Sequence, residues 1–259
     1  MTPAEIKEAL KGLGIRATRV RGQHFLVDRG ALKKIVDAAE LANDDAVLEI
    51  GPGLGVLTRE LVRHAGCVCA VELDQALATR LDSLGLPKDR LTVRRGDVRA
   101  IPNAALVGPC TKKRYKLVAN IPYNITSDVL EKFLLEEPSP VCMVLLVQRE
   151  IAERIVASAG RMSRLGVLVQ YFGKPDIVSR VDRHAFWPAP RVESAIVRVR
   201  RYPEEVLGRR EMIVSRDEFF RVVRSGFAAP RKKLLGNLRG GLGRARSEVA
   251  RCLLDTKIS

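Results

Sequence analysis

The sequence has little of what metal centres and membrane spans need. Only three histidines occur in 259 residues, and no two of the five cysteines form a CxxC pair, so we expect no bound metal. The longest stretch without a charged residue, residues 100–111, is too short to cross a membrane, which takes about 20 apolar residues. The N-terminal residues include Glu5 and Glu8 and lack the apolar core of a signal peptide. We therefore expect a cytoplasmic protein that does not cross a membrane.

The cysteines are few and irregularly spaced. They stand at positions 67, 69, 110, 142 and 252, and the first two alternate within a predicted strand, so their side chains should point the same way, into the core. An odd number of cysteines in apolar surroundings, without a signal peptide, is typical of a reducing compartment. The sequence therefore predicts reduced thiols.

Acidic residues are scarce relative to basic ones. Forty-five lysines and arginines against 30 acidic residues leave a net charge of +15 and a pI near 10.1. Such a charge favours a polyanionic partner, either nucleic acid or anionic lipid, although a generally basic proteome would also explain it.

The basic excess is concentrated near the C-terminus. Residues 198–246 contain fourteen basic and five acidic residues and so carry a local charge of +9. The basic positions are 198, 200, 201, 209, 210, 216, 221, 224, 231, 232, 233, 239, 244 and 246. A solvated helix face would usually interleave the two signs more evenly. We interpret the segment as a surface that contacts RNA phosphates, where the contacts fix position and are sensitive to salt.

Short apolar runs alternate with amphipathic stretches in the first part of the chain. Strands are predicted at residues 46–50, 67–73, 91–95, 115–120 and 141–148. Helices are predicted at residues 31–41, 54–64, 75–84, 127–135 and 149–159. Strands that alternate with helices in this way form right-handed βαβ units around a parallel sheet. The predicted fold class is therefore α/β.

The pattern changes after residue 161. Residues 165–172 are expected to be helical, and residues 177–181 and 194–201 to be strands. Two further helices are expected at residues 217–227 and 231–238, in the basic segment. We therefore place a domain boundary near residue 202, which divides the chain into residues 1–201 and residues 202–259.

Glycines and acidic side chains follow the first three predicted strands. Gly51, Gly53 and Gly55 come directly after the first, where glycine lets the backbone turn tightly and approach a ligand. Their G-x-G-x-G spacing differs from that of dinucleotide folds and phosphate-binding loops, which suggests a ligand without a pyrophosphate. Glu72 ends the second strand and could hold a ribose, and Asp97 follows the third and could accept from an adenine amine. Each fits an ordinary turn or cap, but together they predict an adenosine-type ligand at the carboxyl edge of the sheet.

The segment after the fourth predicted strand has the most informative chemistry. Asn120 offers an amide oxygen as an acceptor, Pro122 keeps Ile121 extended, and Tyr123 offers a flat face to a base. A planar exocyclic amine is a poor nucleophile because its lone pair is delocalised into the ring. Two acceptors that grip its hydrogens would favour a pyramidal nitrogen whose lone pair faces an electrophile, which is catalysis by positioning and electrostatics. The plainer alternative is a turn with a stray aromatic residue.

Six segments together resemble the ribosomal RNA adenine N6,N6-dimethyltransferase family, in the order found there. They are Gly22–Asp28, Val47–Gly55, Val71–Asp74, Gly96–Asp97, Asn120–Thr126 and Phe186–Ser194. The similarity covers residues 18–238, nearly the whole chain. It implies an S-adenosylmethionine-dependent methyltransferase of class I, with a Rossmann-like, mostly parallel sheet. Residues 1–201 would form the catalytic domain, and residues 202–259 a small, basic, helical RNA-binding domain.

The resemblance also implies roles for single residues. Contacts with S-adenosylmethionine are implied for His24, Leu26, Gly51, Glu72, Asp97 and Asn120. Glu72 would hold the ribose of this cofactor, and Asp97 its adenine amine. Tyr123 would stack on the flipped target adenine, with Phe186 on its other face, while Asn120 would lie between cofactor and base. Many bacterial members have asparagine where this chain has His24.

The implied activity is transfer of methyl groups to N6 of two adjacent adenines in a 3′-terminal hairpin of small-subunit ribosomal RNA, during maturation of that subunit. The partner would be this RNA or a precursor particle, and we expect a monomer. One alternative is a large-subunit ribosomal RNA adenine N6-methyltransferase of the antibiotic-resistance type, which the Phe186–Ser194 segment and the basic C-terminus disfavour. The other is a non-catalytic RNA-binding assembly factor, which the intact Asn120–Tyr123 segment disfavours.

Overall fold

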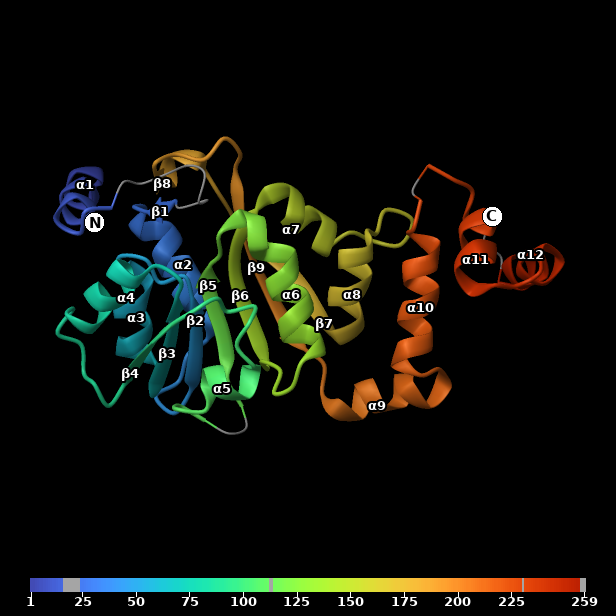
Figure 1. Cartoon of the computed structure of the whole chain (residues 1–259), viewed down its shortest axis with the longest axis horizontal. Helices are drawn as coiled ribbons and strands as arrows, with labels where there is room; N and C mark the ends of the chain where they lie inside the picture. The colour runs from blue at the N-terminus through green and yellow to red at the C-terminus, as the bar shows by residue number, and fades with distance from the viewer. Residues whose placement is uncertain (16–23, 112–113, 230, 257–259) are drawn as a thin grey trace.

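A seven-stranded sheet forms the centre of the computed structural model (Figure 1), which describes residues 1–15, 24–111, 114–229 and 231–256. The strand order is β4-β3-β2-β5-β6-β9-β7. The first five of these strands run parallel, β9 pairs antiparallel with β6, and the edge strand β7 pairs antiparallel with β9. Their bounds are β2 Ala46–Ile50, β3 Cys67–Glu72, β4 Leu91–Arg95, β5 Lys116–Asn120, β6 Cys142–Gln148, β7 Gly173–Val181 and β9 Ser194–Arg201. The α/β class and the mostly parallel sheet are therefore confirmed.

Helices cover both faces of this sheet, and each face has its own core. On β2, Val47 packs into the core that also contains side chains of α2 and α3, whereas Leu48 packs into the core with α5, α6, α7 and α8. All of β2 is buried, which explains why a strand between two helical layers is apolar along nearly its whole length. The helix bounds are α2 Arg29–Ala39, α3 Val56–His64, α4 Gln75–Asp82, α5 Asn103–Val107, α6 Thr126–Leu135, α7 Arg149–Ile155 and α8 Arg164–Phe172.

Every strand and helix predicted between residues 31 and 159 forms, with the largest shift at the end of α7. Several short elements were not predicted from the sequence. The helix α1, Pro3–Gly12, begins with a capping box between Thr2 and Glu5 that the sequence does display. The strands β1, Phe25–Leu26, and β8, Phe186–Trp187, pair with each other antiparallel. Two-residue strands carry no periodicity, so only the folded chain reveals them.

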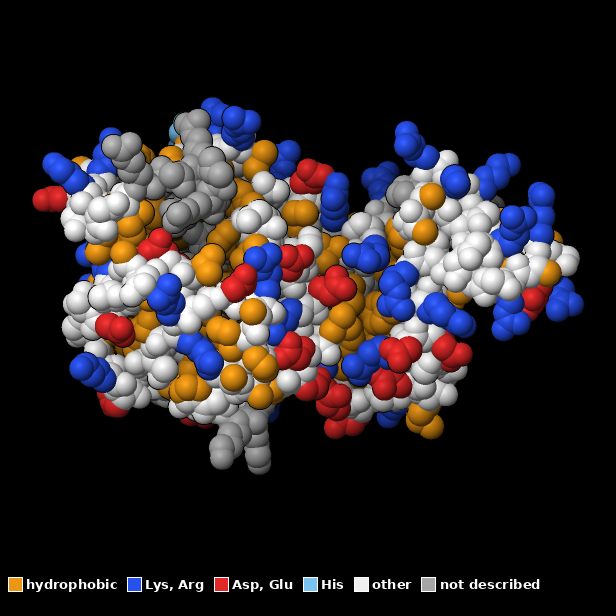
Figure 2. Space-filling model, in the orientation of Figure 1, with side chains coloured by type: hydrophobic (Ala, Val, Ile, Leu, Met, Phe, Trp, Pro, Cys, Tyr) orange, Lys and Arg blue, Asp and Glu red, His pale blue; other side chains and the backbone are white. Residues whose placement is uncertain are grey.

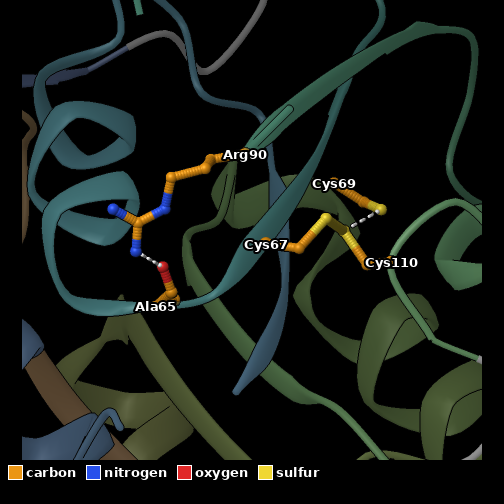
Figure 3. The surroundings of a disulfide bond; sticks show 5 residues. All are labelled: Ala65, Cys67, Cys69, Arg90 and Cys110. Atoms are coloured by element: carbon orange, nitrogen blue, oxygen red, sulfur yellow. Dashed lines mark hydrogen bonds between the residues drawn. A yellow bond between two sulfur atoms is a disulfide. The ribbon is translucent and has the colours of Figure 1, made fainter. Parts of the chain in front are cut away.

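The prediction that all cysteines are reduced is wrong for one pair. Cys67, at the start of β3, forms a disulfide with Cys110, which follows α5 (Figure 3). The two residues are 43 positions apart, and the fold brings their Cα atoms to 5.5 Å, so spacing along the sequence gave no sign of the bond. Cys69, Cys142 and Cys252 are free. The expectation that Cys67 and Cys69 point the same way is confirmed, because both sulfur atoms lie beside Cys110.

The chain after β9 is helical and extends away from the sheet beyond α8 (Figure 1). Its helices are α9 Glu204–Ile213, α10 Arg216–Gly226, α11 Leu234–Leu242 and α12 Arg246–Asp255. Tyr171 and Phe172 of α8 meet Phe219 and Phe220 of α10, with ring centroids 4.8 to 6.0 Å apart. The guanidinium of Arg216 lies over the ring of Phe172. No helix among the described residues is long and apolar enough to span a bilayer.

Replacing Phe220 with alanine should loosen this aromatic junction and destabilise the protein by about 3–5 kcal/mol, because a buried ring is lost and a cavity remains. Val222 lies on the same helix but is 44% exposed, so Val222→Ala should change the free energy of unfolding by no more than about 0.5 kcal/mol. Urea unfolding of both variants measures the difference. Equal effects would show that the junction does not hold α10 in place.

Candidate functional site

A cavity of about 680 Å³ opens at the carboxyl edge of the parallel sheet. Gly51 follows β2, Glu72 ends β3 and Asn120 ends β5, and all three line the cavity. The parallel register between β2 and β3 aligns Ile50 with Val71, so the residues that come next on each strand reach the same edge. In open α/β sheets this edge is where ligands bind.

The loop after β2 lines the cavity. Gly51 and Gly53 have φ values of +64° and +58°, which side chains rarely adopt. A Cβ atom on Gly53 would lie 3.2 Å from the ring of Phe25, and one on Gly51 would lie 3.6 Å from the ring of Pro122. Glycine at these positions therefore lets the loop pack closely against β1 and the segment after β5, and both glycines line the cavity.

Glu72 is fixed in place by backbone donors. The amide of Gly53 donates to Oε2 and the amide of Asp74 donates to Oε1, both at 3.0 Å. The side chain is 6% exposed, and burial raises the pKa of this carboxyl while the backbone hydrogen bonds lower it. Each oxygen has a second lone pair, so a held carboxylate of this kind can accept from two neighbouring hydroxyls of a sugar.

Glu49 is a site residue that the sequence reading missed. It lines the cavity, is 1% exposed, and its Oε2 atom has no hydrogen-bond partner among the described residues. Burial, with a smaller contribution from the nearby Glu72, raises the pKa of this carboxyl to about 8. An acidic residue inside an otherwise apolar strand was the available signal. Two buried carboxyls at one cavity favour a ligand that carries positive charge.

Asn120 and Tyr123 are held by residues distant in the sequence. The Asn120 amide donates from Nδ2 to the carbonyl of His24 at 3.1 Å, which leaves Oδ1 as the acceptor. The Tyr123 hydroxyl shares a hydrogen bond of 2.6 Å with Ser194, whose side chain is buried. The ring of His24 stacks on Tyr123 with centroids 5.6 Å apart, and its Nδ1 donates to the carbonyl of Pro188 at 2.7 Å. One acceptor and one aromatic face are thus oriented side by side.

Leu26 also lines the cavity, but two of the residues expected at the site do not. The carboxylate of Asp97 pairs at 2.8 Å with Arg99, which also reaches Asp128, and this contact lowers the pKa of Asp97. Phe186 is 3% exposed and pairs with Leu26 in the ladder between β1 and β8, so its ring lies in the core. The structure therefore gathers His24, Leu26, Gly51, Glu72, Asn120 and Tyr123, and leaves Asp97 and Phe186 outside the cavity.

The basic segment is only partly available to a partner. Six of its arginines are engaged within the fold, through ion pairs or a backbone carbonyl: Arg198, Arg200, Arg201, Arg210, Arg216 and Arg244. Six others are exposed on α10, on α11 and on the turn between them: Arg221, Arg224, Arg231, Lys232, Lys233 and Arg239. Figure 2 shows basic side chains gathered on this C-terminal part of the molecule. We call these six residues the α10–α11 basic surface.

Comparison with known proteins identifies the family of this chain. Residues 16–256 match the family model described as ribosomal RNA adenine dimethylase. The chain belongs to this family. A relative named ribosomal RNA small subunit methyltransferase A, from Dehalococcoides mccartyi, is 43% identical over 246 residues, which cover 95% of this chain and 82% of the relative. One of the same name from Pelotomaculum thermopropionicum is 39% identical, over 95% of this chain and 85% of the relative.

Two solved structures of S-adenosylmethionine-dependent methyltransferases also match over most of the chain. A dimethyladenosine transferase from Plasmodium falciparum superposes with a TM-score of 0.71 at 30% identity, covering 91% of this chain and 83% of that one. The 23S rRNA methyltransferase ErmE superposes with a TM-score of 0.66 at 30% identity, covering 91% of each chain. The fold implied by the resemblance is therefore confirmed.

Replacing Glu49 with glutamine should stabilise the protein relative to the wild type, and this advantage should grow as the pH rises. The carboxyl ionises near pH 4.5 in the unfolded chain but near pH 8 in the folded one. Its contribution to stability is therefore fully present below pH 4.5 and is lost as the pH rises to 8. The amide does not titrate, so the free energy of unfolding of Glu49→Gln minus that of the wild type should grow by about 3–5 kcal/mol over this range.

Urea unfolding at a series of pH values measures this difference. Glu131→Gln is the matched control, because Glu131 lies on the surface of α6 and is half exposed. Its difference from the wild type should stay flat. A flat difference for Glu49→Gln as well would contradict a buried, protonated carboxyl at the cavity.

Proposed function

We propose that this protein transfers methyl groups from S-adenosylmethionine to N6 of two adjacent adenines in a 3′-terminal hairpin of small-subunit ribosomal RNA, as a step in maturation of that subunit. The observation that carries the proposal is the meeting of Glu72, Asn120 and Tyr123 at one cavity on the carboxyl edge of the sheet. This combination offers a sugar acceptor, an amine acceptor and a base-stacking face within one ligand-sized space.

The cavity residues fit the cofactor. Glu72 would accept from the ribose hydroxyls, and Gly51, which lines the cavity without a side chain, would let the ligand approach the backbone. His24 and Leu26 would close the cavity from the N-terminal side. The buried carboxyls of Glu49 and Glu72 suit the positive charge of the ligand. When bound, S-adenosylmethionine supplies a methyl group that its sulfonium already activates for displacement.

The protein's own part in the reaction is to orient the target amine. The Oδ1 atom of Asn120 accepts a hydrogen of the amine and so favours a pyramidal nitrogen, with its lone pair directed at the methyl group. Tyr123 stacks on the extruded adenine, and its hydrogen bond to Ser194 fixes the ring. Ser194 is thus a positioning residue. Because the amine already lies beside the donor, no strong acid or base is needed.

Asp97 and Phe186 retain proposed roles that need local rearrangement. Asp97 could accept from the adenine amine of the cofactor only if Arg99 releases one of its oxygens. Phe186 could face the target base only if the β1–β8 ladder moves.

The α10–α11 basic surface would hold the RNA. Its six cationic side chains would contact phosphates and set the position of the substrate, while RNA shape selects the site. The substrate would be ribosomal RNA or a precursor particle, and the protein would act in the cytoplasm. We propose a monomer, since one chain supplies the residues of the cavity.

The second candidate is methylation of large-subunit ribosomal RNA, which the similarity to the 23S rRNA methyltransferase ErmE favours. The two relatives named for the small subunit are 43% and 39% identical, against 30% for ErmE, so we favour the small subunit. A non-catalytic assembly factor would have no need of an oriented Asn120 and Tyr123 at a cavity.

Incubation with labelled S-adenosylmethionine and either small-subunit or large-subunit particles tests the function. Label should enter the small-subunit RNA, and primer extension should stop at two adjacent adenines near its 3′ end. Asn120→Ala should lower incorporation roughly 100-fold or more, because the acceptor for the amine is lost. Asn43→Ala, an exposed change away from the cavity, should leave it unaltered.

Other results would decide between the alternatives. Label in the large-subunit RNA alone would favour the second candidate. Absence of label with the wild type and with Asn120→Ala, while both bind RNA equally well, would indicate an assembly factor. Full activity of Asn120→Ala would contradict the role given to this residue.

Reversal of charge at Arg231, Lys232 and Lys233 should weaken RNA binding and flatten its dependence on salt. Each lost phosphate contact lowers the slope of log affinity against log salt concentration by about 0.9 on a duplex. Lys88→Glu is the control, since Lys88 is exposed between α4 and β4, far from α11 (Figure 1). Filter binding between low and moderate salt measures both slopes. An unchanged slope in the triple variant would show that these residues are only solvated.

A further inference from the structure

Three cysteine sulfur atoms meet at the end of β3 that lies away from the cavity (Figure 3). Cys67 and Cys69 come from β3 and Cys110 from the loop after α5, and all three sulfur atoms lie within 4.8 Å of one another. Glu72, at the other end of β3, lines the cavity. The cluster is therefore separate from the site of methyl transfer but shares a strand with it.

The disulfide between Cys67 and Cys110 closes a loop of the chain that contains α4, β4 and α5. Both acidic residues proposed to hold the cofactor, Glu72 and Asp97, lie inside this loop. A cross-link between distant parts of a chain stabilises the fold mainly by restricting the unfolded state, and more so for longer loops. The disulfide is therefore expected to stabilise the part of the fold that carries Glu72 and Asp97.

A hydrogen bond holds the turn before β3 on the side of the strand opposite the disulfide. A guanidinium nitrogen of Arg90 donates to the carbonyl of Ala65 at 2.6 Å, which joins the beginning of β4 to the turn before β3 (Figure 3). Figure 3 shows Arg90 and the disulfide on different sides of the strand. The disulfide is the contact that binds the loop after α5 to this strand covalently.

The three cysteines differ in their access to solvent. Cys67 and Cys110 are half-buried, so a small thiol or disulfide can reach them, whereas Cys69 is 3% exposed. The Cys69 thiol donates to the sulfur of Cys110 at 2.9 Å, and burial raises its pKa to about 11. A thiol in this state is a poor nucleophile at neutral pH. The reactive pair is therefore Cys67 with Cys110, and Cys69 is a neighbour that stays reduced.

We propose that Cys67 and Cys110 form a reversible redox staple, which a low-molecular-weight disulfide closes and a low-molecular-weight thiol opens. In closure, the Cys67 thiolate attacks the small disulfide and expels one thiol. The Cys110 thiolate then attacks the Cys67 sulfur and expels the second. Two protons and two electrons pass from the cysteine pair to the small disulfide, which becomes two thiols. Reduction reverses both steps, and the fold is more stable with the staple closed.

The test compares the full chain after treatment with glutathione disulfide and after treatment with dithiothreitol. Alkylation under denaturing conditions, followed by peptide mass spectrometry, identifies which cysteines are joined. Oxidised wild type should contain the Cys67–Cys110 link and melt about 5–15 °C higher than the reduced protein, as expected for a loop of this length. The comparison needs no variant to fold.

Three variants assign the effect to its residues. Cys67→Ser and Cys110→Ser should melt at one temperature in both conditions, whereas Cys69→Ser, the matched control, should keep the full difference. Several results would overturn the proposal: no link after oxidation, a link that includes Cys69, or equal melting temperatures of linked and reduced wild type. So would one thiophilic metal ion per chain, bound by the three thiols and protecting them from alkylation. None of these results depends on methyl transfer, so they leave the proposed function untouched.

Discussion

The parallel register of β2, β3 and β5 is the constraint on which the site depends. Because the three strands point the same way and lie next to one another, the residues that follow them arrive at one edge. Gly51, Glu72 and Asn120 are up to 69 positions apart in the sequence yet line one cavity. The amide of Asn120 then completes the arrangement by binding the carbonyl of His24, which joins the N-terminal segment to the end of β5.

Desolvation gives this edge its chemical character. Glu49 and Glu72 are both buried, and the cost of holding two carboxyls there raises the pKa of each. A cationic ligand relieves that cost, whereas a neutral or anionic one does not. A backbone amide donates to the carboxylate of Glu72, and the Asn120 amide donates to the carbonyl of His24. The acceptor oxygens of both side chains are therefore oriented before any ligand binds. The proposed reaction therefore rests on positioning rather than on acid–base catalysis.

Much of this could be predicted from the sequence, and the failures have physical causes. The run at 46–50 was predicted to the residue, because a strand buried on both faces must be apolar. Glu72 and Asn120 were found because strand ends share an edge. The Cys67–Cys110 bond and the support of Tyr123 by Ser194 join residues far apart in sequence, which spacing cannot reveal. Asp97 forms an ion pair with its near neighbour Arg99, which competes with a ligand for the carboxylate. The position of Asp97 at a strand end does not predict this pair.

A crystal structure of the protein with S-adenosylhomocysteine tests the central claim most directly. The account predicts the ribose hydroxyls on the carboxylate of Glu72 and the sulfur atom beside Asn120 and Tyr123, with the loop at Gly51 beneath the ligand. A ligand bound elsewhere, or one that fills the cavity without touching Glu72 and with its sulfur remote from Asn120, would contradict it.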